Sequence, residues 1–203
     1  MRTRMMIGLS VAAGVCATAA WFMTRPVVAA DDKPAAAQPK VWVEYTTDGK
    51  VKQPGGYRKW VFLGTPLTPN DMNGGEAAFP EFHNVYMDPD SFAHLEKTGE
   101  YRDGTVLVKE LTAVGTKELS SGKGYFQGEF TGLEISVKDT KRFKDEPGNW
   151  AYFSFGHKYP LKAEAAKNGA ASCNKCHLDN AKDFVFSDVY PVLNAALKSA
   201  KKK

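Results

Sequence analysis

The chain has 203 residues, of which 43% are hydrophobic and 25% are charged. This size and composition are typical of one globular domain and exclude two large ones. The formal net charge is +4, and much of the excess lies at the two ends, including the tail 201–203. The remaining chain is close to neutral and has no basic patch, which argues against a nucleic-acid partner.

Residues 1–30 are typical of a signal peptide. Arginines precede a nearly uncharged run at 5–23, and the small residues Val28 and Ala30 suit a signal peptidase. The run is also close to the roughly 20 residues that span a bilayer, so an uncleaved anchor is the alternative. A lipid anchor on Cys16 fits less well. We expect a periplasmic (exported) protein, anchored to the membrane if the segment is not cleaved.

Residues 31–40 mix proline, alanine and charge, which indicates a linker before a domain at 41–203. Cleavage after residue 30 removes Cys16 and leaves Cys173 and Cys176. A disulfide is then possible only between these two, so the domain must be held together by its core or by a cofactor.

Most apolar segments of the domain are short, rich in β-branched or aromatic residues, and bounded by Gly, Pro, Asn or Asp. Helices are expected at about 88–97, capped by Asp88 and ended by Gly99, and at 161–167 and 189–200. The predicted fold class is mainly β (α+β), an antiparallel β-sheet core with a few short helices. The predicted strands lie at 41–46, 57–64, 85–87, 105–111, 125–137 and 150–155.

The stretch "ASCNKCHLDN" at 171–180 contains Cys-x-x-Cys-His, the attachment signature of c-type haem. In such a motif the thiols of Cys173 and Cys176 add to the haem vinyl groups, and His177 ligates the iron. A redox dithiol would need a βαβ context early in the domain. A structural zinc site would need further ligands, and only scattered histidines remain. The sequence therefore predicts one haem c per chain.

Methionine commonly closes the sixth position of electron-carrier haems. After cleavage only Met72 and Met87 remain, both upstream of the motif. An open iron face is therefore expected, which favours binding or chemistry on a small ligand. Four-helix gas-binding cytochromes also carry a C-terminal haem motif, but the short alternating strands of this chain do not fit their helical period.

Lys109 stands on an unusual face of the strand predicted at 105–111. Alternation groups it with Leu107 and Leu111. One interpretation is a lysine whose stem packs while its amine reaches water. The other is a desolvated amine that acts as a nucleophile in its free-base form.

Four further stretches, taken with the haem motif, resemble the cytochrome P-460 family over about residues 57–193. The resemblance implies a β-rich homodimer with one c-type haem whose ring is also cross-linked to a lysine. That lysine lies in a V-K-E-L strand segment, which matches 108–111 and makes Lys109 the candidate. The stretches are "YRKWVFLGTPLTPNDMNGG", "DPDSFAHLEKTGEYRDGTVLVKEL", "GYFQGEFTGLEISVKD" and "DEPGNWAYFSF".

The resemblance further implies oxidation of hydroxylamine at the open iron face, with nitric oxide or other nitrogen oxides as ligands or products. Electrons would leave to an acceptor such as a soluble cytochrome, and the resemblance suggests Glu134 as the proton acceptor. The alternation of side chains along the strand conflicts with this role, because it groups Glu134 with Ser136 and Lys138 on a solvent-facing side. Glu134 can line a polar pocket if the core lies on its side or if Gly132 makes a bulge.

His83 stands where the family pattern has an arginine, so it offers a titrating imidazole in place of a fixed cation. Phe79 and Phe82 are candidate walls of the haem pocket, or ordinary aromatic members of a β core. His94 is expected to be exposed, and His157 could approach the haem without any motif that supports it.

These features together favour an exported, hydroxylamine-oxidising haem enzyme. The first alternative is a non-enzymatic nitric oxide or gas binder like the cytochrome c′-beta proteins, which resemble this fold, lack the lysine bond and cap the iron with aromatic residues. A plain electron carrier with a closed sixth position is the second. Lys109 discriminates between the enzyme and the gas binder.

Overall fold

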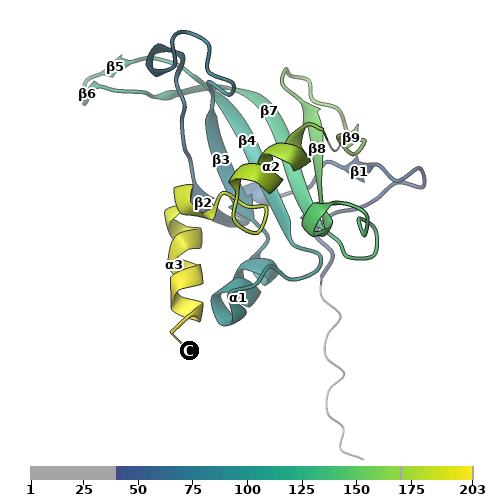
Figure 1. The fold of residues 1–203 in the computed structure, drawn as a ribbon. Coiled ribbons are helices and arrows are strands. Elements are labelled where there is room, and N and C mark those ends of the chain that lie inside the picture. The colour runs from purple at the N-terminus through teal and green to yellow at the C-terminus, as the bar shows by residue number, and fades with distance from the viewer. Residues whose placement is uncertain (1–39, 170, 203) are drawn as a thin grey trace, which may run out of the picture. The chain divides into compact units, whose positions relative to one another are not determined.

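The computed structural model describes residues 40–169 and 171–202 (Figure 1). The predicted signal peptide lies outside the described residues, as does the predicted linker apart from Lys40. Within the described part of the chain, no helix has both the length and the apolar character needed to cross a membrane.

A five-stranded antiparallel sheet forms the centre of the fold, which confirms the predicted fold class. Its strand order is β2-β3-β4-β7-β8, and each neighbouring pair is antiparallel. The five strands follow one another across the sheet in chain order, as in a meander. The strands are β2 (Val61–Gly64), β3 (Phe82–Met87), β4 (Val106–Val114), β7 (Gln127–Lys138) and β8 (Trp150–Gly156).

Smaller elements lie around the sheet. β1 (Val51–Lys52) pairs with β9 (Glu164–Ala165), and β5 (Glu118–Leu119) pairs with β6 (Gly122–Lys123) in a hairpin that extends beyond the sheet (Figure 1). The 3-10 helices among the described residues are η1 (Tyr57–Lys59), η2 (Asn70–Met72), η3 (Pro147–Asn149) and η4 (Ser187–Val189).

Three local predictions were wrong. The helix expected at 161–167 is absent, because β9 pairs with β1 and both Val51 and Ala165 are buried in the core. The strand expected at 41–46 contributes only an isolated bridge at Tyr45. The first part of the strand expected at 57–64 is the 3-10 helix η1.

The first helix, α1 (Pro89–Thr98), has the ends predicted from the sequence. The Asp88 carboxylate accepts a hydrogen bond from the backbone N–H of Ser91 at 2.9 Å, and Gly99 ends the helix in a left-handed conformation. Asp88 is fully buried and also accepts from the N–H of Val106 at 2.8 Å and from Arg102 at 3.1 Å. One carboxylate therefore ties α1 to the start of β4.

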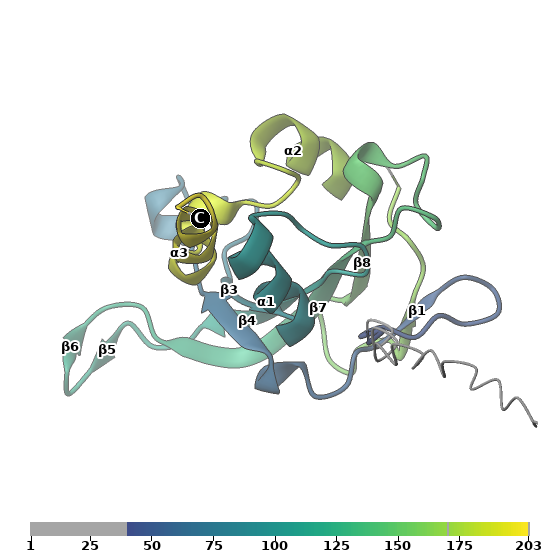
Figure 2. The same ribbon diagram turned by 90° about the horizontal axis from the view of Figure 1, so that it is seen from below.

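Both faces of the sheet are covered. One face packs its apolar side chains, including Val108, Ile135 and Phe153, against the N-terminal part of the domain. The other face carries α1, α2 (Cys173–Asn180) and α3 (Pro191–Ala200), as Figure 2 shows. Met87 and Leu107 pack with helix residues such as Leu193 on this side. Polar residues in the middle of β4, such as Glu110 and Thr112, are consequently buried.

Replacing Asp88 tests the connection between α1 and β4. Asp88→Ala removes a helix cap and leaves the Arg102 guanidinium without its buried partner, so we expect a loss of about 3 kcal/mol in the free energy of unfolding. Urea unfolding of the haem-loaded protein measures it. The exposed Glu96→Ala variant on the same helix is the control, and equal midpoints for the two variants would contradict the role of Asp88.

Candidate functional site

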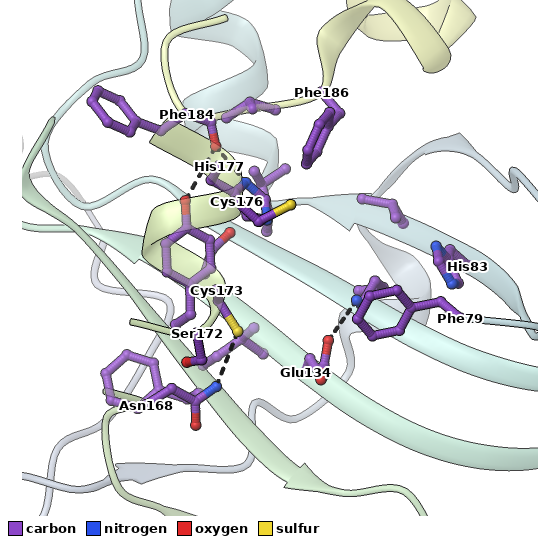
Figure 3. A pocket seen from close by; sticks show the side chains of 18 of the residues that line it. Phe79, His83, Glu134, Asn168, Ser172, Cys173, Cys176, His177, Phe184 and Phe186 are labelled. Carbon is purple, nitrogen blue, oxygen red and sulfur yellow. Dashed lines mark hydrogen bonds and ion pairs between the residues drawn. The ribbon is translucent and has the colours of Figure 1, made fainter. Parts of the chain in front are cut away.

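A cavity of about 540 Å³ lies between α2 and the central strands of the sheet (Figure 3). Its volume is in the range of small-molecule and cofactor sites. Most of its walls are apolar or aromatic, with a few polar groups at two places, around α2 and on the strands opposite. The aliphatic and aromatic residues of this lining include Phe79, Val85, Leu107, Tyr152, Phe184, Val185, Phe186 and Tyr190.

The α2 helix places the predicted haem-attachment residues at this cavity. Cys173 and Cys176 are both free thiols and both line the cavity, because a spacing of three residues puts them on one helix face. The Cys173 thiol lies 3.4 Å from the Asn168 amide nitrogen. The pair is thus presented together, as double thioether attachment requires.

Asn174 between the two cysteines faces away from solvent and fastens α2 to the sheet. Its amide donates to the Trp150 carbonyl at 3.1 Å and to the Glu146 carboxylate at 2.9 Å, and the residue is buried. Glu146 also pairs with Lys167. These bonds hold the cysteine-bearing helix against β8.

His177 has the surroundings of a metal ligand. Its Nδ1 lies 2.8 Å from the Phe184 carbonyl, which can only accept, so Nδ1 carries the proton and Nε2 is left for a metal. Tyr152 and Phe186 pack against the ring with centroids 4.4 and 4.8 Å away. Burial lowers the pKa of His177, which favours the neutral imidazole that binds metals.

The described residues contain no group of three or more His, Cys, Asp or Glu side chains placed to hold a metal ion. A structural zinc site takes four protein ligands, which the surroundings of Cys173 do not supply. His177 is instead a single imidazole suited to a metal that brings its other ligands with it, as haem iron does.

Lys109 and Glu134 face each other on the opposite wall. They are register partners on β4 and β7, so their side chains leave the sheet on the same face. The Lys109 Nζ lies 2.5 Å from Glu134 Oε2 and 4.8 Å from the centre of the Phe79 ring. The Lys109 amine therefore forms an ion pair at the cavity, and its side chain is 27% exposed.

The structure places Glu134 in the cavity and not on the solvent side that parity indicated. Its side chain is only 16% exposed, because α2 and the loop after β8 cover this face of the sheet. The pairing of β7 with β8 is irregular between Leu133 and Glu134, close to the bulge considered at Gly132. Burial raises the pKa of Glu134, but Lys109 and His157 outweigh burial and leave the pKa below its ordinary value.

His83 lines the cavity and is half-buried. Burial, reinforced by the nearby Lys109 charge, lowers its pKa to about 4. Its ring packs edge-on against Phe79 at 5.8 Å between centroids. The His83 Nε2 is buried and has no hydrogen-bond partner among the described residues. It is therefore available to a molecule in the cavity.

The two phenylalanine predictions have different outcomes. Phe79 lines the cavity (Figure 3), and the Lys109 Nζ lies 4.8 Å from the centre of its ring. Phe82 is not a cavity wall: it alternates with His83 along β3, so it points to the other side of the sheet, where it is buried. Four aromatic cavity residues were missed: Tyr152, Phe184, Phe186 and Tyr190. Tyr152 could have been found from alternation along β8. Phe184 and Phe186 could have been found from their spacing of two residues in the segment that follows the haem motif.

Fold and site together define a class: a β-sheet protein with a cavity suited to haem, bounded by a Cys-x-x-Cys-His helix on one wall and an ion-paired lysine on the other. The chain matches the family model for Cytochrome P460 over residues 54–187, more than half of its length, and belongs to that family. This confirms the resemblance inferred from the motifs and marks the chain as a haem protein. A comparison with curated proteins found no match.

The side chains present fit a c-type haem. Two free thiols and a neutral imidazole with one nitrogen available stand at one wall of a mainly apolar cavity. At the other wall, the His83 Nε2 lacks a partner among the described residues. This donor set is the one that covalent haem attachment and iron ligation require.

The low pKa of His83 predicts a dependence of stability on pH. Its native pKa of about 4 lies below the value of 6.5 for an unperturbed histidine. Between these pH values the unfolded chain binds a proton that the native protein does not, so the free energy of unfolding falls as the pH drops. The loss is expected to reach up to about 3 kcal/mol.

His83→Gln should remove this contribution, so that unfolding free energies at pH 7 and pH 4.5 differ less than in the unmodified protein. Urea titrations at the two pH values measure the difference. His94→Gln, outside the cavity, accounts for the general effect of losing a histidine. If the free energy of unfolding depends on pH in the same way in His83→Gln and in the unmodified protein, the burial of His83 does not cause this dependence.

Proposed function

We propose that this protein is an exported, homodimeric mono-haem c-type cytochrome that oxidises hydroxylamine, with nitric oxide or related nitrogen oxides as ligands or products. The observation that carries the proposal is the Lys109–Glu134 pair, which lines the same cavity as Cys173 and Cys176. Figure 3 shows Glu134 on the strands opposite these cysteines. Family membership supports the haem and its link to hydroxylamine chemistry.

In this proposal the chain holds haem at four points. Cys173 and Cys176 would form the two thioether bonds, His177 would ligate the iron and Lys109 would be joined to the ring by a third covalent bond. Lys109 suits this role because its amine is inside the cavity and close to the aromatic face of Phe79. A third tether would fix the position of the ring and distort it, which is one means by which proteins tune haem.

When bound, the haem iron supplies an electron sink for the oxidation of the substrate nitrogen, and the electrons pass on to an acceptor such as a soluble cytochrome. Glu134 acts as the proton acceptor, because its lowered pKa keeps the carboxylate ionised at neutral pH. The His83 Nε2 offers a hydrogen bond to hydroxylamine, which has both donors and acceptors. The apolar walls limit the access of water to the reaction.

A gas-binding protein of the cytochrome c′-beta type is the second candidate. Phe79 favours it, since a phenylalanine at the cavity wall can cap a bound diatomic ligand. An electron carrier has less support. Of the two methionines in the described residues, Met72 is exposed and Met87 lies in the core, and neither lines the cavity.

The lysine bond is tested by mass spectrometry of haem peptides from the mature protein. We expect haem joined to Cys173, Cys176 and a peptide that contains Lys109. Lys109→Arg keeps the charge but not the nucleophilic amine, so the variant should load haem, show an ordinary c-type spectrum and lose hydroxylamine oxidation. Lys97→Arg on α1 is the control. Haem bound only to the cysteines in the unmodified protein would favour the gas binder.

The role of Glu134 is tested by Glu134→Gln, which keeps the shape of the side chain but cannot accept a proton at neutral pH. Steady-state oxidation of hydroxylamine should slow by about 100-fold, within the usual contribution of a general base. Haem content should not change. Glu129→Gln, exposed on the same strand, should be as active as the unmodified protein. Full activity of Glu134→Gln would exclude this carboxylate as the proton acceptor.

A further inference from the structure

We propose that His157 is the proton outlet of the cavity, taking protons from Glu134 and releasing them to solvent. The inference rests on the proposed function and extends it to a residue that no motif indicated. His157 follows the end of β8 and is not among the residues that line the cavity.

The two oxygens of Glu134 have different partners. Oε2 pairs with Lys109 at 2.5 Å inside the cavity, whereas Oε1 lies 3.0 Å from His157 Nε2. The side chain of Glu134 is 16% exposed and that of His157 is 46% exposed. The carboxylate thus connects an enclosed amine with an imidazole that reaches water.

The backbone allows this contact through a close approach at Gly132. A Cβ at this position would lie 2.9 Å from the Gly156 carbonyl oxygen and 3.2 Å from the His157 Cα. Real Cβ atoms are rarely found so close to backbone atoms, so only glycine lets the end of β8 lie against β7 here. Because Gly132 is two residues before Glu134, the same approach places His157 beside the carboxylate.

The proposed chemistry requires such an outlet. Oxidation of hydroxylamine to nitric oxide releases one proton with each electron, and the electrons leave through the haem. A single carboxylate in the cavity must therefore pass on each proton before it accepts the next. A proton moves from the substrate to the Glu134 carboxylate, then to the His157 imidazole, and finally to water, which leaves both groups as they began. Histidine suits this step because an imidazole can accept a proton at one ring nitrogen and release a proton from the other.

The charges around the relay are few. Glu134 faces His157 from β7, Lys109 from β4 pairs with the other oxygen of the same carboxylate, and Lys158 follows His157 in the chain. If the Lys109 nitrogen is bonded to haem, as proposed, it is no longer a primary ammonium. His157 would then be the main partner that keeps Glu134 ionised.

Two variants of the haem-loaded protein separate a relay from a structural contact. His157→Gln keeps an N–H that can donate to Glu134 but cannot carry a proton, and His157→Ala removes both functions. We expect hydroxylamine oxidation to slow about tenfold or more in both variants. Added imidazole should restore His157→Ala, because the position is open to solvent. His94→Gln is the control and should be fully active.

Infrared spectroscopy gives a measurement that needs no substrate. The band of the protonated Glu134 carboxyl group is identified because it is absent from Glu134→Gln. His157 lowers the pKa of Glu134, so the pH at which the carboxyl band forms should rise in His157→Ala. If the unmodified protein oxidises hydroxylamine, two results would each overturn the relay alone. One is a His157→Gln variant as active as the unmodified protein, and the other is a carboxyl band that does not shift in His157→Ala. An unmodified protein that does not oxidise hydroxylamine would overturn the proposed function, and the relay with it.

Discussion

The Lys109–Glu134 ion pair depends on the register between two strands of one sheet. The two residues are direct partners on β4 and β7, and Val85 on β3 continues the same row. A shift of either strand by one residue would turn one of the two charged side chains to the opposite face. The apolar packing on that opposite face, which includes Val108 and Ile135, fixes the register and therefore fixes the charged pair.

Burial on both faces explains why alternation gave an incomplete account of this site. Parity correctly separated Glu134 from Leu133 and Ile135, but it assumed that the polar side of β7 meets water. Here that side meets the cavity, since α2 and the segment after it cover the sheet. A sequence shows which residues share a face, whereas the cover over that face comes from elements far along the chain.

The strands, the capped helix α1 and the haem motif could be predicted because each has a local signal. Asp88 and Gly99 mark the ends of α1 by chemistry that acts within one turn. The mistaken helix at 161–167 had such a signal too, but the pairing of β9 with β1 prevailed over it. The contact of His157 with Glu134 has no local signal, because it depends on how β8 ends beside Gly132.

The two variable positions of the haem motif have opposite surroundings. Asn174 is buried and hydrogen-bonded to the Trp150 carbonyl, while Lys175 is exposed and pairs with Asp179, one turn later on the same helix. Mutational tolerance should therefore differ sharply within one pentapeptide. In relatives with the same helix packing, position 174 is expected to keep a short amide side chain, whereas position 175, on the surface, is expected to vary.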